Sequence, residues 1–246
     1  MWSNKLLHFD AFLSTLMTFL VAAVLYVVFI NISILDPFEK AFTDFKFTDI
    51  FYSNRLNKEE RNNKIVLVNI KRADRFEIAQ AINAVAAQKP KVIGLDIIFK
   101  DRKQMFIDSI LKDAFKLNKN LVSAYYHEKD SLVNYHPYFT TQNETKGFIN
   151  LNLKGQDAVI REFIGVKTED NIEYAFATQL AIKAGYIDQR YAKKELNKPV
   201  PINYVGNKDV LLNFDIEDIL QRDKIAAMKD AVVIFGYLSS GNADFD

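Results

Sequence analysis

The sequence predicts an α/β protein with an open, mostly parallel central sheet flanked by helices, an antiparallel hairpin insertion and one N-terminal transmembrane helix. Three observations carry this prediction. An uncharged apolar run lies near the start of the chain, short β-branched runs alternate with amphipathic segments after it, and one stretch in the middle alternates apolar and polar residues. These patterns divide the chain into a membrane segment and a water-soluble body.

The apolar run covers residues 11–30, and its only polar side chains are Ser14, Thr15 and Thr18. A helix of this length rises about 30 Å, the thickness of the hydrocarbon core of a bilayer. A cleaved signal peptide is the alternative, but its apolar region is roughly 7–15 residues long and ends in small residues, whereas this run ends in Phe29-Ile30. We therefore expect a retained transmembrane helix over residues 11–32 after a short cytoplasmic leader, residues 1–10.

The flanking charges bear on which side of the membrane the body lies. Lys5 precedes the run, and Lys40 and Lys46 follow it, so the positive-inside rule does not decide the orientation. The short leader and the absence of cysteine favour a cytoplasmic N-terminus, although a lack of cysteine is compatible with either compartment. We expect residues 36–246 to form a periplasmic or extracellular domain on the inner or plasma membrane.

The composition narrows the class of protein. The 32 basic and 31 acidic residues balance, so the chain has no electrostatic footprint for nucleic acid. With 20 Phe and 11 Tyr but only 8 Gly and 5 Pro, the body is typical of an ordered globular domain.

The core of that domain is expected to begin at residue 65, after a juxtamembrane helix over 38–54 and a polar loop. Residues 65–70 (IVLVNI) and 91–99 (KVIGLDIIF) are typical of buried parallel strands. Residues 75–88 between them have apolar positions at helical spacing, so the three segments predict a right-handed βαβ crossover. A helix over 103–117 and a strand at 120–125 repeat the pattern.

The second half of the domain changes character. Residues 147–153 and 158–167 alternate apolar and polar side chains, which predicts a half-exposed antiparallel hairpin with Gly155 in its turn. A helix over 173–185 ends at a glycine, and the basic stretch 190–198 is typical of a solvated face. The remaining expected elements are strands at 210–214 and 231–237 and a short helix at 215–220. The abrupt ending after the last strand suggests that the natural protein continues.

Ligands of open α/β sheets bind beyond the carboxyl ends of the strands. The loop after the last strand is the best candidate, because Gly236 and Gly241 bracket Ser239 and Ser240, and its backbone N–H groups could face an anion or a carboxylate. The alternative is an ordinary turn that leaves the strand. Its glycine spacing does not match a nucleotide-binding loop, and we expect no cofactor.

Asp96 lies within an otherwise apolar strand. A buried carboxylate must find hydrogen-bond partners or become neutral. Asp96 is therefore a candidate ligand-binding or proton-handling residue, and the alternative is that it bonds backbone N–H groups where the strand ends.

No pattern supports catalysis or a metal site. His127 and His136 are nine residues apart, a spacing that matches no common zinc site, and no Gly-x-Ser-x-Gly elbow is present. We assign no catalytic residue and no metal ligand.

With these segments placed, the chain resembles a CHASE domain of the second type, a family of extracytoplasmic sensory modules. The resemblance covers residues 44–246, and it rests on the order and spacing of its matching pieces. They are Asp49-Ile50-Phe51, IVLVNI, Asp74-Arg75, KVIGLDIIF, Asp108 with Leu111, GFINL, Ile160-Arg161, INYVGN, DIEDIL and VVIFGYLSSGNADFD.

The resemblance implies an α/β sensor preceded by one transmembrane helix, in a family whose members continue into further transmembrane helices and a cytoplasmic output domain. The chain departs from the family where the first strand ends, since Asn69 stands where many members have an acidic residue. A Trp/Pro-rich insert before the arginine that matches Arg75 is also missing. The matched positions carry over as candidate site or framework residues: Asp74, Arg75, Asp96, Arg161, Gly236 and Asp244.

Three hypotheses follow. The first is a non-catalytic, membrane-anchored extracytoplasmic sensory domain that binds a small-molecule or protein signal, with a homodimer as one arrangement. The second is an envelope enzyme that uses Asp96 and the Ser239-Ser240 loop. The third is an envelope protein-interaction module without a small ligand, which uses residues 147–167. The first rests on the resemblance more than on site chemistry.

Overall fold

The computed structural model describes residues 3–30, 62–129, 131–141, 144–151, 160–168, 171–204 and 210–238. The chain divides into two compact units, residues 1–51 and residues 52–246. The first unit contains α1 (Ser3–Ile30), a single uninterrupted helix. The juxtamembrane helix expected at 38–54 and the turn at Gly155 lie outside the described residues.

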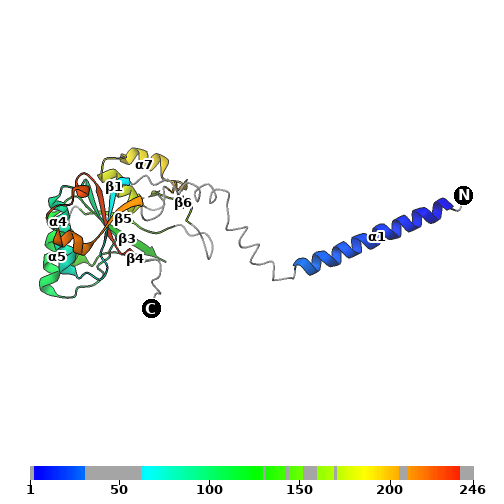
Figure 1. Ribbon diagram of the computed structural model, residues 1–246, viewed down its shortest axis with the longest axis horizontal. Coiled ribbons are helices and arrows are strands. Elements are labelled where there is room, and N and C mark those ends of the chain that lie inside the picture. Colours follow the sequence, from blue (N-terminus) through cyan, green and yellow to red (C-terminus); the bar gives the residue numbers. More distant parts are fainter. Residues whose placement is uncertain are drawn as a thin grey trace. The chain divides into compact units, whose positions relative to one another are not determined.

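The second unit is built on a seven-stranded mixed sheet (Figure 1). Its strands, in spatial order, are β10 (Leu211–Asp215), β1 (Asn62–Asn69), β11 (Val232–Gly236), β2 (Val92–Leu95), β3 (Leu121–Glu128) and β4 (Ser131–Val133), with β5 (Thr145–Phe148) also paired to β3. All of these pairings are parallel except the β3–β4 hairpin. The predicted fold class is confirmed.

Helices cover both faces of the sheet. On one face lie α4 (Arg75–Ala87), α5 (Met105–Leu117) and α8 (Ile216–Gln221), whose apolar side chains share a large buried core with the strands. On the other face α6 (Phe176–Lys183) packs on β2, β3 and β5. The 3₁₀ helices η2 (Pro137–Phe139) and η4 (Ala226–Met228) contribute to the larger core.

Small antiparallel sheets and one further helix complete the described part of the domain. β6 (Glu162–Phe163) pairs with β9 (Val200–Pro201), and β7 (Val166–Lys167) pairs with β8 (Glu173–Tyr174). The basic stretch 190–198 is largely exposed, as expected, and most of it lies in α7 (Gln189–Glu195).

The predicted pairing of residues 147–153 with 158–167 is wrong in its described parts. Residues 145–148 instead form β5, parallel to β3, and the later residues pair with β8 and β9. Gly147 explains this position, because a Cβ there would lie 2.4 Å from the Cα of Phe176. The glycine lets the start of α6 approach β5 closely, which alternation of apolar residues could not indicate.

Two strands differ from their predicted extents or neighbours. β2 ends at Leu95 rather than Phe99, so Asp96 lies just beyond the strand. β1 and β2 are parallel and joined through α4, as predicted, but β11 lies between them.

The helix expected at 173–185 begins at Phe176 because residues 173–174 form β8, and Gly185 follows it with a φ of +75°.

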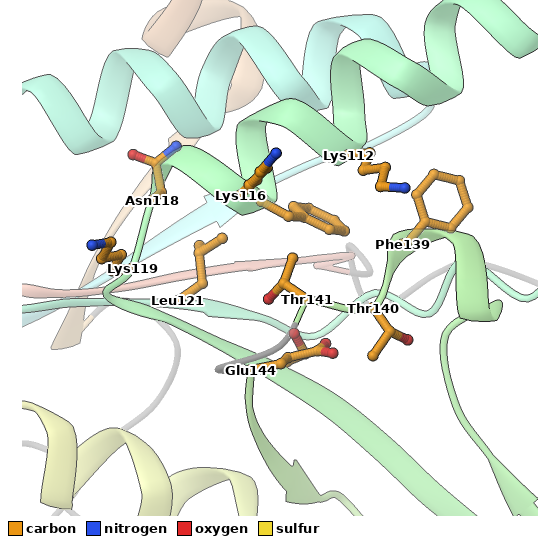
Figure 2. A pocket seen from close by; sticks show the side chains of 11 residues that line it. Lys112, Lys116, Asn118, Lys119, Leu121, Phe139, Thr140, Thr141 and Glu144 are labelled. Atoms are coloured by element: carbon orange, nitrogen blue, oxygen red, sulfur yellow. The ribbon is translucent and has the colours of Figure 1, made fainter.

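Side chains leave two kinds of hollow on this domain. One kind opens at the carboxyl ends of the strands. A separate cleft of about 500 Å³ lies beneath the last turns of α5 (Figure 2).

Candidate functional site

The carboxyl ends of four parallel strands meet at one edge of the sheet. Asn69, the last residue of β1, lies in register with Asp215 of β10 on one side and with Gly236 of β11 on the other. Leu95 of β2 follows beyond β11, in register with Phe235. This edge is where ligands of open α/β sheets bind.

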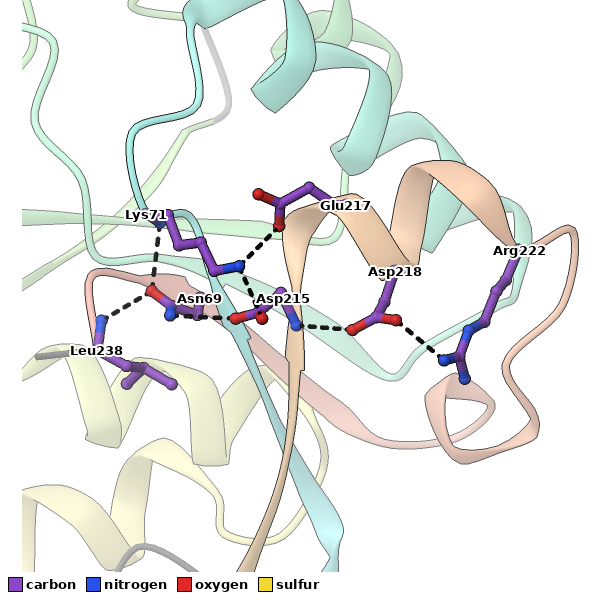
Figure 3. A network of polar contacts seen from close by, with 7 residues as sticks. All are labelled: Asn69, Lys71, Asp215, Glu217, Asp218, Arg222 and Leu238. Carbon is purple, nitrogen blue, oxygen red and sulfur yellow. Dashed lines mark hydrogen bonds and ion pairs between the residues drawn. The ribbon is translucent and has the colours of Figure 1, made fainter. Parts of the chain in front are cut away.

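Asn69 joins three segments at this edge (Figure 3). Its Oδ1 accepts hydrogen bonds from the backbone N–H groups of Lys71 (3.2 Å) and Leu238 (3.1 Å). Its Nδ2 donates to Oδ1 of Asp215 at 3.2 Å. An amide can donate and accept at the same time, which a carboxylate cannot. Asn69 therefore uses both its oxygen and its nitrogen at this edge, which an ionised aspartate in its place could not do.

Lys71 extends this set of contacts. Its Nζ lies 2.8 Å from Oδ2 of Asp215 and 3.3 Å from Oε2 of Glu217. The hydrogen bond to Asp215 is the main cause that raises the pKa of Lys71. We call Asn69, Lys71, Asp215, Glu217 and Leu238 the Asn69 network. Its charged side chains are largely solvated, so salt screens their attraction.

The backbone of Lys71 adopts a φ of +47°, in the left-handed region that non-glycine residues seldom occupy. This turn leads the chain from β1 into α4. Lys71 also lines an open cleft of about 590 Å³, together with Asn69, Glu217, Tyr237 and other residues.

Asp74 is the N-cap of α4. Its Oδ1 accepts from the N–H groups of Phe76 (2.8 Å) and Glu77 (2.9 Å), and Oε2 of Glu77 accepts from the N–H of Asp74 (2.9 Å). This reciprocal pair is a capping box, which satisfies N–H groups that the helix leaves free. The geometry therefore gives Asp74 a framework role.

Arg75 ties α4 to α5. Its Nη1 lies 2.6 Å from Oδ1 of Asp108, and its Nη2 donates to the carbonyl of Asp101 at 2.7 Å. The guanidinium also lies over the rings of Phe99 and Phe139, 5.4 Å from each centroid. The pair stands in the wall of a second edge cleft, of about 470 Å³.

Asp108 has no solvent-exposed side-chain surface. Burial raises its pKa, but the hydrogen bonds from Arg75 and from the N–H of Lys103 outweigh this effect, so the pKa is lowered overall. The carboxylate is therefore charged at neutral pH, and it accepts hydrogen bonds from both Arg75 and the backbone of Lys103.

Asp96 and Gly236 form a corner of the same edge. The N–H of Asp96 donates to the carbonyl of Phe235 at 2.9 Å, and a Cβ added at Gly236 would lie 3.6 Å from Cβ of Asp96. The expectation of a buried Asp96 is wrong, because the residue reaches solvent once β2 has ended. Neighbouring protein atoms still partly desolvate its carboxyl group, which raises its pKa.

The other candidate residues lie elsewhere. Arg161 precedes β6, and its carbonyl accepts from the N–H of Ile202 beside the β6–β9 pair, away from the strands of the main sheet. Ser239, Ser240 and Asp244 lie outside the described residues. The structure thus brings Asp74, Arg75, Asp96 and Gly236 to one edge and sets Arg161 apart.

The two histidines predicted not to bind zinc have other contacts. Nε2 of His127 lies 3.0 Å from Oε2 of Glu173, and Nδ1 of His136 accepts from the N–H of Tyr138 at 3.1 Å. Within the described ranges, no group of three or more His, Asp or Glu side chains could hold a metal ion.

Sequence reasoning did not predict that Asp215 and Leu238 meet Asn69 at this edge. Asp215 is 146 residues from its partner Asn69, and Leu238 is 169 residues from it, so no local pattern could reveal the contacts. The only signal was that each residue directly follows or ends a predicted strand.

Comparison with protein-family models identifies a family. The model of the CHASE2 domain family matches residues 18–245 of the chain. No curated protein and no solved structure matches it.

Proposed function

The chain belongs to the CHASE2 domain family, and from this premise we propose that it is a non-catalytic sensory domain held outside the cytoplasm by α1. CHASE2 is a family of extracytoplasmic sensory domains. The family match over nearly the whole chain is the observation that carries the proposal.

The proposed anchor is the apolar part of α1. The described residues contain one helix long and apolar enough to cross a membrane, Phe9–Val27, and none of that segment is buried in the structure. Length and composition support this role, and a signal sequence near an N-terminus would meet the same criteria. We propose residues 1–10 as a cytoplasmic leader, 11–32 as the membrane span and 36–246 as the extracytoplasmic domain.

Within the domain, we propose two roles for the residues at the carboxyl edge of the sheet, a framework role and a signal-binding role. Asp74 and Arg75 hold the framework of α4 and α5, since their polar groups already bond to the protein. The corner of Asp96 and Gly236 is left as a contact for a signal. A bound signal would act by favouring one of two conformations of the domain, in proportion to its difference in affinity for them.

Single-cysteine labelling tests the proposed topology directly, because the natural sequence contains no cysteine. Lys193→Cys places a thiol on the exposed face of α7, and Ser3→Cys places one in the leader. A membrane-impermeant maleimide should label Lys193→Cys in cells with an intact inner membrane and Ser3→Cys only after lysis.

The opposite labelling pattern would overturn the orientation. The intact mass of the purified protein separates an anchor from a signal peptide, because loss of about the first thirty residues would show cleavage.

A protein-interaction module is the second candidate. The surface predicted for it, residues 147–167, does not form the expected hairpin in its described parts, and two exposed apolar side chains in the first turn of α5 support a different surface. Met105 is 78% exposed and Phe106 is 74% exposed. A photo-crosslinking residue at Phe106 should then capture a partner in membranes, with one at Lys193 as the control. A product of twice the chain mass would identify a homodimer, and equal products at both positions would argue against a specific surface.

A further inference from the structure

A cleft beneath the last turns of α5 is separate from the carboxyl edge. Figure 2 shows Lys112 and Lys116 projecting from α5, with Thr141 and Glu144 opposite them. We name this hollow of about 500 Å³ the α5 cleft. Its lining includes Lys112, Phe115, Lys116, Leu121, Phe139 and Glu144. The volume lies within the range of small-molecule sites.

Glu144 is a buried acid with unused hydrogen-bonding capacity. Its side chain is only 10% exposed, and neither carboxylate oxygen accepts a hydrogen bond from any described residue. Nζ of Lys146 lies 3.1 Å from Oε2, which balances the charge without the alignment of a hydrogen bond. A carboxylate has about four acceptor positions, and buried acceptors in proteins are normally filled. Glu144 therefore offers acceptors to a donor in the cleft.

Tyr135 is a second buried polar group next to this cleft. Its ring stacks on Phe115 at a centroid distance of 5.7 Å, and its hydroxyl has no aligned hydrogen bond within the described part of the chain. Burial strongly raises the pKa of Tyr135. The nearby Ser123 side chain lowers this pKa in part and Glu144 raises it further, so the hydroxyl stays neutral. Tyr135 therefore places a polar hydroxyl beside the cleft, while Glu144 lines the cleft itself.

The mouth of the cleft is cationic. Lys112, Lys116 and Lys119 line it, and Nζ of Lys112 lies 4.2 Å from the centroid of the Tyr138 ring. Lys146 already balances the one acidic side chain in the lining. The lysines therefore leave an excess of positive charge at the mouth, which favours an anion there.

We propose that the α5 cleft binds a small organic anion, a carboxylate or a phosphate, whose other end carries hydroxyl or ammonium donors. The donors face Glu144, the anionic group lies among the lysines, and Phe115 and Leu121 contact the carbon skeleton. This inference rests on the proposed sensory function and names the chemical class of its signal.

The cleft also shares a residue with the carboxyl edge. Phe139 lines the α5 cleft and lies under the guanidinium of Arg75. Phe99 packs against Phe139 with a centroid distance of 5.9 Å, and Arg75 lies over both rings. An occupant of the cleft would therefore touch the aromatic cluster on which the Arg75–Asp108 pair rests.

Calorimetric titration of the full chain in detergent micelles tests the proposal. Glucose 6-phosphate and L-glutamate serve as anions that also carry donors. Glucose carries only the hydroxyl donors of glucose 6-phosphate, and inorganic phosphate carries only its anionic group. These two half-probes test the donor end and the anionic end of the ligand separately. At least one of the two anions should bind, and the half-probes should bind at least about tenfold more weakly. If neither anion binds, the proposal is overturned.

Two variants locate the binding. Glu144→Gln keeps the shape but loses the charged acceptor, and Lys116→Gln removes an exposed ammonium that the fold does not need. Each should weaken binding of the positive probe at least about tenfold. Lys194→Gln, on the exposed face of α7, is the matched control and should leave the affinity unchanged. Unchanged affinity in both cleft variants would also overturn the assignment.

The outcome is separable from that of the topology experiment. Extracytoplasmic labelling without binding would reject the cleft ligand and retain the sensory domain. Binding together with a labelling pattern that places Lys193→Cys in the cytoplasm would retain the cleft ligand and reject the extracytoplasmic sensory domain.

Discussion

The Asn69 network and the α5 cleft are both polar, but they differ in how well their polar groups are satisfied. Asn69 makes three hydrogen bonds within the chain, whereas Glu144 makes none with the described residues. A satisfied network stabilises the structure without any ligand, while an unsatisfied buried acceptor carries a cost that a ligand donor can remove. The comparison indicates that the Asn69 network is framework and that the cleft is poised for binding.

The largest expected effect comes from breaking the Arg75–Asp108 pair, which belongs to the satisfied region. Asp108→Ala should lower the free energy of unfolding by about 3 kcal/mol, since it removes the carboxylate partner of Arg75, whose side chain is only 11% exposed. Chemical denaturation measures this loss. The double variant Arg75→Met, Asp108→Leu should lose less, because no unpaired charge remains. Equal stability of wild type and Asp108→Ala would contradict the framework role.

The same pair predicts a pH dependence. Because the folded-state pKa of Asp108 is below its ordinary value of 3.8, its stabilisation is complete above that pH. It is lost as the pH falls through the folded-state pKa. The stability difference between wild type and Asp108→Asn should therefore shrink below pH 3.8.

The Asn69 network should show the next largest effect. Asn69→Ala removes three hydrogen bonds near the surface and should cost about 2 kcal/mol in denaturation experiments. Asn213→Ala, at an exposed position of the neighbouring strand β10, is the control and should stay within about 0.5 kcal/mol of wild type. Similar losses in both variants would mean that the network adds nothing specific.

Glu144→Gln should change the free energy of unfolding by no more than about 0.5 kcal/mol, in contrast to the framework residues. The lost carboxylate has no aligned hydrogen bond to the described residues, and Lys146 retains access to water at 23% exposure. Thermal and chemical unfolding of the ligand-free protein measure the change. A loss above about 2 kcal/mol would show that Glu144 belongs to the framework, as Asp108 does.

Asp96→Asn tests a carboxyl group that is only partly buried, and it should have the smallest effect on stability. Partial burial raises the folded-state pKa of Asp96, so ionisation slightly destabilises the folded state. The variant should therefore melt slightly higher than wild type at pH 7, and the gain should vanish as the pH falls below the ordinary value of 3.8. A lower melting temperature at pH 7 would reveal a stabilising partner for the carboxylate.

Apolar runs and helical spacing of apolar residues predicted the strands and helices in which they occur. The buried runs at β1 and β11 and the helical spacing in α4 and α5 are local properties, and each element formed close to its expected place. The capping box of Asp74 and Glu77 is also local, since the two residues lie three apart, but it was not predicted from the sequence. The candidate site residues came from the family resemblance and from the rule that ligands of open α/β sheets bind beyond the carboxyl ends of the strands.

Only the tertiary structure decided which strands are neighbours and which polar groups meet. The insertion of β11 between β1 and β2, the pairing of β5 with β3, and the meeting of Asn69 with Asp215 and Leu238 all join distant parts of the chain. The sequence by itself determined the apolar helix, the alternating strands and helices, and the family. Partner choice depends on close approach and packing between segments far apart in the chain, and no local spacing of residues encodes that.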